Sequence, residues 1–252
     1  MGIAIRNSTE IKQIAQANKI VARTLEEIKK HISTGVSLKE LDKIAESFVL
    51  SCGAKPSFKG LYGFPSSICT SVNQVIIHGI PTDYKLKDGD IIGIDLGVEK
   101  NGWFGDAAFT IAVGNVSQSE QKLINCAIDT LNFSIDIIQQ GMRFKELSFE
   151  IEKYILEYGY QPLRSYCGHG IGKKPHEEPE IPNYLDSKNP KQGPKIKNGM
   201  VFCIEPMICQ QSGESKVLDD KWSVVSVDGL KGSHYEHTIA IVNNKAVVLS
   251  QE

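Results

Sequence analysis

Apolar residues recur at three- and four-residue spacing in four segments of the chain, which predicts four amphipathic helices. Their starts are marked by capping residues or by a preceding glycine. These helices are expected from a cap at Ser8 or Thr9 to about His31, after Gly35, from Ser119-Glu120 onward, and after Gly141. Each half of the chain therefore begins with two helices.

The segments after each helix pair contain short apolar runs or alternating apolar and polar residues, which is typical of strands. Strands are expected at residues 67–72, 75–78, 91–98 and 104–113, and again at 200–209, 223–227 and 235–242. Residues 178–195, rich in proline, lysine and asparagine, are expected to form a surface loop. Helices followed by hairpins, twice over, predict an α+β fold with helices packed on one face of a curved antiparallel sheet.

The two halves also share short sequence motifs in the same order. Leu86 to Asp95 returns as Ile196 to Glu205, Gly35 to Leu41 as Gly141 to Leu147, His78-Gly79-Ile80 as His169-Gly170-Ile171, and Gly102 to Asp106 as Gly232 to Glu236. A diverged duplication would leave this colinear order. We expect a single domain, residues 1–252, with an internal repeat of about residues 8–115 and about 118–245. The alternative is a duplication that serves fold symmetry alone, with the acids at strand ends by accident.

Two carboxylates of the first half are expected to lie close together. Asn101-Gly102 between two strand-like runs is a strong hairpin signal, and this turn would place position 95 opposite 108 and position 97 opposite 106. Asp95 and Asp106 would then be diagonal neighbours on one face of the sheet. Such a pair repels itself unless a positive charge lies between the two groups. A bound cation is therefore expected, in preference to two solvated surface acids.

The second half supplies the matching acids Glu205 and Glu236. Four carboxylates and one or two imidazoles suit Mn, Fe(II), Co or Zn, and they could hold two ions side by side, as in metal-assisted hydrolysis. Among the histidines, His78, His169 and His176 are favoured because they lie in glycine- or proline-flanked loops beside the acid-bearing strands. By contrast, His31 is expected on a helix surface, and His234 and His237 remain open.

Composition and charge exclude several other classes of protein. The chain has 252 residues, of which 41% are hydrophobic and 23% charged, and its net charge is −2. These values are ordinary for a soluble globular protein and give no reason to expect a nucleic-acid or membrane partner for the whole chain. No apolar run reaches the roughly 18 residues of a membrane span, and no signal peptide is visible. Six cysteines without a C-x-x-C pair favour a reducing cytoplasm.

The motifs around these candidate residues resemble those of the type I methionine aminopeptidases. The resemblance covers nearly the whole chain and rests on Asp95, Asp106, Gly168-His169-Gly170-Ile171-Gly172, His176-Glu177-Glu178-Pro179, Ile204-Glu205-Pro206-Met207 and Tyr235-Glu236-His237-Thr238. It implies the pita-bread fold, in which two pseudo-symmetric halves surround a centre of two divalent metal ions. It also implies removal of the initiator methionine from nascent proteins whose second residue is small.

The resemblance further implies a role for each site residue. Asp95 would bind one ion and His169 and Glu205 the other, with Asp106 and Glu236 bridging the two. Glu205 would also accept a proton during hydrolysis, and His78 and His176 would hold the substrate's peptide group. The side chains expected to line the methionine pocket are Phe64, Cys69 and Trp222.

The chain departs from the family pattern at Gly97 and Ala107, where many bacterial members carry threonine, and at Pro175, where others often carry a bulkier residue. These departures leave open the hydrogen bonds to the metal carboxylates and the contour of the cleft. Two alternatives are an Xaa-Pro peptidase of the same fold, which usually has an additional N-terminal domain, and a non-enzymatic binding protein, which would lack metal ligands.

The expected partners are the N-termini of nascent polypeptides, met by a monomeric enzyme in the cytoplasm. A transient contact with ribosomal RNA is a further expectation, carried by the lysine-rich segment with Lys188, Lys191, Lys195 and Lys197. The sequence leaves the physiological metal open, because one set of ligands accepts several ions.

Overall fold

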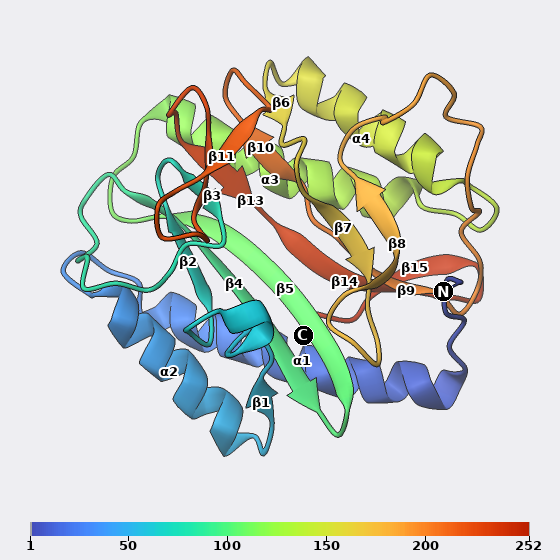
Figure 1. The fold of residues 1–252 in the computed structure, drawn as a ribbon, viewed down its shortest axis with the longest axis horizontal. Helices are drawn as coiled ribbons and strands as arrows, with labels where there is room; N and C mark the ends of the chain where they lie inside the picture. The colour runs from blue at the N-terminus through green and yellow to red at the C-terminus, as the bar shows by residue number, and fades with distance from the viewer. Residues whose placement is uncertain (1, 252) are drawn as a thin grey trace.

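The computed structural model describes residues 2–251 and has the expected α+β architecture (Figure 1). Its helices are α1 (Ser8–His31), α2 (Leu38–Ser51), α3 (Gln118–Ile137) and α4 (Phe144–Glu157), with a short 3₁₀ helix, η1 (Leu61–Gly63). All four α-helices were predicted. The first-half strands are β1 (Lys55–Pro56), β2 (Cys69–Val72), β3 (Val75–Ile77), β4 (Ile91–Lys100) and β5 (Trp103–Ala112).

The second half contributes ten further strands. They are β6 (Gln161–Pro162), β7 (Cys167–Gly170), β8 (Glu177–Pro182), β9 (Val201–Ile204), β10 (Met207–Cys209), β11 (Ser215–Val217), β12 (Val224–Ser226), β13 (Gly232–His234), β14 (Glu236–Val242) and β15 (Lys245–Val248).

A nine-stranded sheet forms the centre of the molecule. Its order is β1-β4-β5-β14-β9-β7-β8, with β2 paired to β4 and β15 paired to β14, and every pairing is antiparallel. The central neighbours β5 and β14 come from different halves of the chain. Two three-stranded sheets, β13-β10-β6 and β11-β12-β3, join strands that are distant in sequence.

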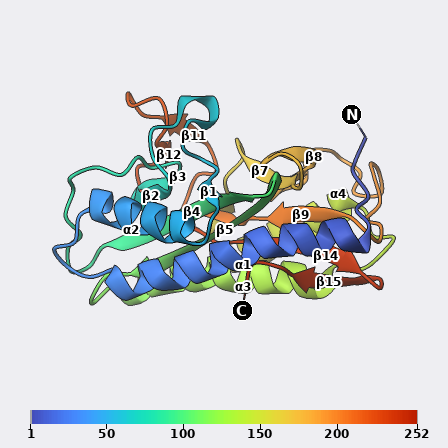
Figure 2. The same cartoon turned by 90° about the horizontal axis from the view of Figure 1, so that it is seen from below.

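The helices lie on one side of the large sheet, and the irregular segments lie on the other. In Figure 2, α1 and α3 run along the lower edge of the molecule, while β3, β11 and β12 stand above the sheet. The upper face of the sheet is therefore not covered by these helices and can form a site.

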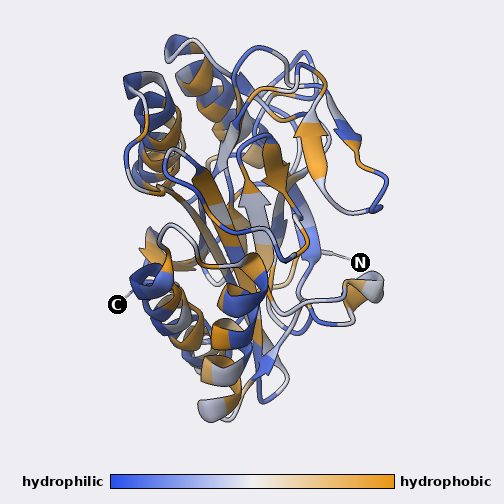
Figure 3. Ribbon diagram, turned by 90° about the vertical axis from the view of Figure 1, so that its left-hand side faces the viewer, coloured by the Kyte–Doolittle hydropathy of each residue, from blue (hydrophilic) through white to orange (hydrophobic). Residues whose placement is uncertain are grey.

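Two apolar clusters fill the space between the helices and the sheet. One contains Ile28 and Leu41 with Ile94 of β4, and the other contains Leu147 and Phe202 of β9. Figure 3 shows the helices divided between hydrophobic and hydrophilic residues, as expected for helices with one buried face. Tyr235 packs against both clusters, so the two halves share one continuous interior.

The helix starts differ from the prediction by one or two residues. Asn7, and not Ser8 or Thr9, caps α1, because its side chain accepts hydrogen bonds from the backbone N–H groups of Thr9 and Glu10, both at 3.0 Å. Ser117 caps α3, two residues before the expected start. It forms a capping box with Glu120, whose carboxylate accepts from the N–H of Ser117 at 2.7 Å.

One strand prediction and one loop prediction were wrong. The run 200–209 is two strands, β9 and β10, which enter different sheets because the chain turns at Glu205-Pro206. The expected loop 178–195 contains most of β8, in which Pro179 and Ile181 are buried. Pairing with the glycine-rich β7 creates β8, and neither strand has a strong local propensity.

Candidate metal centre

The antiparallel strands at the middle of the sheet bring the four predicted acids to one place. The β4–β5 register pairs Asp95 with Ala108 and Gly97 with Asp106, so the hairpin prediction from Asn101-Gly102 is confirmed. On the adjacent strand β14, Glu236 also pairs with Ala108. Glu205 follows the last residue of β9, the strand on the other side of β14.

Potential ligand atoms converge in overlapping groups at this point of the sheet. Asp95, Asp106 and Glu236 offer oxygens that all lie within 4.8 Å of one another. His169 on β7 approaches from the second half, with its Nε2 atom 3.5 Å from Oε1 of Glu205. Its Nδ1 atom lies 3.1 Å from the carbonyl oxygen of Gly170, which leaves Nε2 directed at the acids.

Each of the four carboxylates has one buried oxygen without a hydrogen-bond partner among the described residues. The buried side-chain atoms without a partner include Oδ1 of Asp95, Oδ1 of Asp106, Oε1 of Glu205 and Oε1 of Glu236. Buried polar atoms are nearly always paired, because an unpaired one costs the free energy of its lost hydration. These unpaired oxygens therefore indicate a bound cation, which oxygen and nitrogen donors would coordinate.

Burial and mutual repulsion hold these acids toward their protonated forms. Burial raises the pKa of Asp95 to about 7. Burial also raises the pKa of Asp106 well above its ordinary value, and the charges of Glu236 and Asp95 add to this shift. The pKa values of Glu205 and Glu236 are raised in the same way, by burial first and by neighbouring acids second. Divalent cations would relieve both causes, so the residues present fit a centre of two such ions.

Two further side chains border this centre. His234, which the sequence left open, is buried, and its Nε2 atom has no hydrogen-bond partner and lies 3.8 Å from Oε2 of Glu205. Burial lowers the pKa of His234 to about 3. Cys203 on β9 lies within reach of His169 and Glu236, but burial raises its pKa well above the ordinary value.

Helix α1 supports the centre from the opposite side of the sheet, which the sequence did not indicate. The Oδ1 atom of Asn18, which is fully buried, accepts a hydrogen bond from the N–H of Asp106 at 3.2 Å. A Cβ atom at Gly105 would lie 2.7 Å from the backbone nitrogen of Asn18, so glycine is required there for the helix to approach β5. Only this tertiary contact identifies Asn18, since its sequence position resembles any polar helix residue.

The other two favoured histidines lie beside the acids. His78 follows β3 and has a positive φ of 59°, and its ring lies 5.1 Å from that of Tyr166. His176 has its ring 4.5 Å from that of His169. Burial lowers the pKa of His78 to about 4 and also lowers that of His176, so both rings are neutral at pH 7. The matched His-Gly-Ile motifs occupy different positions, since His169 lies within the large sheet and His78 outside it.

A cavity of about 880 Å³ opens onto the acids. Phe64 and Cys69 are buried in its wall, and the ring of Phe64 meets that of Trp222 edge-on at 5.0 Å. Phe58 and Leu61 complete this apolar cluster and were not predicted, because their contacts depend on the loop before β2. This apolar cluster forms one part of the cavity wall, and the carboxylates form another.

Phe58 also explains one departure from the family pattern. A Cβ atom at Gly97 would lie 2.1 Å from Oγ of Ser57 and 2.6 Å from a ring carbon of Phe58. A threonine at position 97 would therefore require the 57–58 segment to move. Ala107 is buried in the sheet, where it pairs with Leu96 and His237.

Comparison with known proteins is consistent with this geometry. The model of metallopeptidase family M24 matches residues 12–243. A methionine aminopeptidase of Helicobacter pylori is 58% identical over 252 residues, covering 100% of both chains. Methionine aminopeptidase 1 of Bacillus subtilis is 45% identical over 249 residues, covering 99% of both chains.

Solved structures share the fold. The crystal structure of a methionine aminopeptidase from Thermotoga maritima has a TM-score of 0.96 and 35% identity over 100% of both chains. Prolidase from Pyrococcus furiosus has a TM-score of 0.80 and 25% identity, and the match covers 98% of this chain but 65% of the prolidase. The expected pita-bread fold is thus confirmed, and the chain belongs to metallopeptidase family M24 and, within it, to the methionine aminopeptidases.

Proposed function

We propose that the protein is a metal-dependent aminopeptidase that removes the N-terminal methionine from polypeptides whose second residue is small. The observation that carries this proposal is that four carboxylates, each with an unpaired buried oxygen, line the same cavity as an apolar cluster of side chains. A hydrolytic centre beside a pocket of that character suits an unbranched thioether side chain.

Five residues would hold two divalent ions of Co, Mn, Fe(II) or Zn. We assign Asp95 to one ion, His169 and Glu205 to the other, and Asp106 and Glu236 to both. The central position of β5 and β14, which carry the two bridging acids, supports this assignment. The bound ions supply Lewis acidity toward water and the scissile carbonyl group.

The chain's own groups bind the substrate and move the proton. Glu205 accepts a proton from the attacking water, since its carboxylate borders both His169 and the open cavity. His78 and His176, neutral at pH 7, hold the peptide group by hydrogen bonds. Phe64, Cys69 and Trp222 surround the methionine side chain, and the carboxylates beside the ions bind the free amine.

A peptide panel tests this function. Protein stripped of metal and reloaded with each ion in turn should cleave Met-Gly and Met-Ala peptides and leave N-formylated peptides intact. Met-Lys and Met-Leu peptides should be cleaved at least ~100-fold more slowly, because a large second side chain costs several kcal/mol when it clashes. Equal rates for Met-Leu and Met-Gly would reject the proposed specificity. Cleavage of Ala-Pro but not Met-Gly would instead favour the Xaa-Pro alternative.

We further infer that residues 1–252 form one catalytic domain with the internal repeat described above. The arrangement β4-β5-β14-β9 supports it, because each half contributes an inner strand with a bridging acid and an outer strand with a second acid. Separate expression of residues 1–116 tests this inference, since a half-domain that folds alone would contradict it.

We also propose that the enzyme acts as a monomer in the cytoplasm, on the N-termini of nascent chains and in transient contact with the ribosome. No helix within residues 2–251 is long and apolar enough to cross a membrane. Lys188, Lys191, Lys195 and Lys197 are exposed in the segment between β8 and β9, which supports a transient contact with RNA. Co-sedimentation with ribosomes at low salt, lost when the four lysines become glutamine, tests this contact. Light scattering measures the molar mass in solution and so tests whether the enzyme is a monomer.

A further inference from the structure

Residues 2–6, which precede α1, form part of the wall of the cavity that contains the acids. Gly2, Ala4 and Arg6 line it together with Lys173 and Lys174. This N-terminal arm is fixed to the second half of the molecule, because the N–H of Arg6 donates to the carbonyl oxygen of Gly199 at 2.7 Å.

Arg6 forms an ion pair that is shielded from solvent. Its Nη2 atom donates to Oε2 of Glu177, and the two side chains are only 12% and 15% exposed. The guanidinium group also lies 5.5 Å from the centre of the Trp103 ring. Removing one partner of an ion pair enclosed in this way is costly, because it leaves the other charge buried and uncompensated.

The same glutamate holds the loop that carries His176. The Oε1 atom of Glu177 accepts hydrogen bonds from the backbone N–H groups of Lys173 at 2.7 Å and Lys174 at 3.1 Å. Arg6 also packs against the base of this loop, since a Cβ atom at Gly172 would lie 2.6 Å from Nη2 of Arg6. Loop 172–177 is thus held from inside by Glu177, and Glu177 is held by Arg6.

We propose that Arg6 is a positioning residue for His176, acting through Glu177 and loop 172–177. His176 is adjacent to Glu177 in the chain, and its ring lies between those of His169 at 4.5 Å and Tyr62 at 6.3 Å. Backbone hydrogen bonds of Gly172 with Phe104 and Lys174 also hold this loop, and the Glu177 carboxylate is its side-chain anchor. The kinetic part of this inference rests on the proposed function, in which His176 holds the substrate's peptide group.

The test compares Arg6→Ala, Arg6→Lys, Glu177→Gln and the double variant Arg6→Ala/Glu177→Gln. Cleavage of a Met-Gly peptide by the metal-loaded enzyme should show kcat lowered about tenfold in Arg6→Ala, since sub-ångström misplacement of a substrate-holding group has effects of this order. Metal content should be unchanged and KM altered less than kcat. Arg6→Lys should recover most of the activity, because an ammonium group keeps the charge beside Glu177.

A second measurement does not depend on activity. Hydrogen exchange of the amides of Lys173 and Lys174 should become faster in Arg6→Ala and Glu177→Gln, and unchanged in Arg6→Lys. The double variant should lose no more activity than either single variant, because both changes break the same contact.

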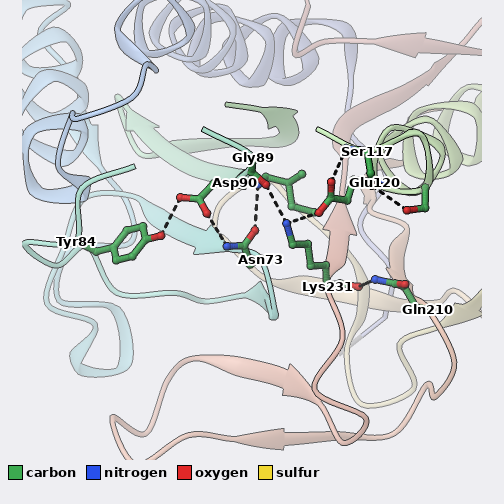
Figure 4. Close-up of polar contacts among 10 residues, drawn as sticks. Asn73, Tyr84, Gly89, Asp90, Ser117, Glu120, Gln210 and Lys231 are labelled. Carbon is green, nitrogen blue, oxygen red and sulfur yellow. Dashed lines mark hydrogen bonds and ion pairs between the residues drawn. The ribbon is translucent and has the colours of Figure 1, made fainter. Parts of the chain in front are cut away.

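Lys231→Met provides the matched control. Lys231 forms a comparably enclosed ion pair, 2.5 Å from Oε1 of Glu120, and neither residue lines the cavity (Figure 4). The Lys231→Met substitution should lower the melting temperature but leave kcat and the hydrogen exchange of the 173–174 amides unchanged. Wild-type kcat in Arg6→Ala with a lowered melting temperature would overturn the proposal and make the arm a structural brace only. If the wild type cleaved no Met-Gly peptide, the proposed function would fail, while exchange would still decide whether Arg6 holds the loop.

Discussion

At the scale of single residues, the two bridging acids should matter more than the others. Asp106→Ala or Glu236→Ala should lose both ions and lower activity by roughly 1,000-fold, corresponding to about 4 kcal/mol of lost transition-state stabilisation. Asp95→Ala should mainly weaken one ion. Elemental analysis per chain distinguishes these outcomes, with the exposed Asp83→Ala as control. Normal metal content in Asp106→Ala would contradict the bridging role.

The histidines near the acids should separate catalysis from metal binding. His78→Ala and His176→Ala should each lower kcat about 100-fold, as loss of a proton-transfer or positioning group does, while metal content stays near that of the wild type. Steady-state kinetics on a Met-Gly peptide, with the exposed His31→Ala as control, measures this. Turnover at the wild-type rate in either variant would remove that histidine from the mechanism.

The residue scale also shows what sequence reasoning can and cannot supply. Asp95 and Asp106 could be placed from the strand period and the turn, because those features are local. The roles of His169 and Glu205 came from family resemblance. Asn18 and Arg6 could not be identified, because their importance lies in contacts made by helix α1 and the N-terminal arm across the fold.

At the scale of elements, the β4–β5 turn is a point where backbone conformation alone sets stability. Asn101 and Gly102 both have positive φ, 53° and 73°, and a Cβ atom at Gly102 would meet nothing within 4 Å. Gly102→Val should therefore destabilise the protein by about 1–2 kcal/mol through strain alone. Gly102→Asn should cost much less, because asparagine tolerates this backbone region. Denaturant unfolding of both variants checks the order, and equal stability would contradict it.

The same hairpin explains which elements were predictable. A turn with positive-φ residues between two runs rich in apolar residues determines β4 and β5 locally, and the register was predicted correctly. By contrast, β7 contains Gly168 and Gly170, whose missing side chains allow the backbones of Cys203 and Glu178 to approach closely. These strands exist because of their partners, so a local pattern could not reveal them.

At the scale of the whole molecule, the halves are joined both by apolar packing and by a polar network. Figure 4 shows Lys231, which donates to the carbonyl oxygen of Gly89 at 3.0 Å and pairs with Glu120 at the start of α3. On the other side of Gly89, Asp90 accepts from Asn73 and Tyr84. The network connects the turn before β4 to the second-half helix, and Lys231 and Glu120 lie outside the lining of the cavity.

The raised pKa values of the buried acids predict how pH and metal act on the stability of the whole molecule. The carboxylates have raised pKa values in the folded protein, about 7 for Asp95, so without metal the folded state binds protons that the unfolded chain has released. Their contribution to stability is present below pH 4 and is lost as pH rises through 7. Burial lowers the pKa of His169 to about 3 and of His78 to about 4, which has the opposite effect, but only below their ordinary value of 6.5.

Between pH 6.5 and 8.5 the carboxylates should therefore dominate the response. The melting temperature of chelated protein should fall across this range, while that of metal-loaded protein should stay level or rise, because bound divalent ions keep the acids ionised and compete with protons. Calorimetry of both forms in matched buffers measures the difference between the two melting temperatures, which should widen with pH. Asp106→Asn, which removes one of these acids, should flatten the slope of the chelated form. A constant difference across the range would mean that the acids do not bind ions as a group.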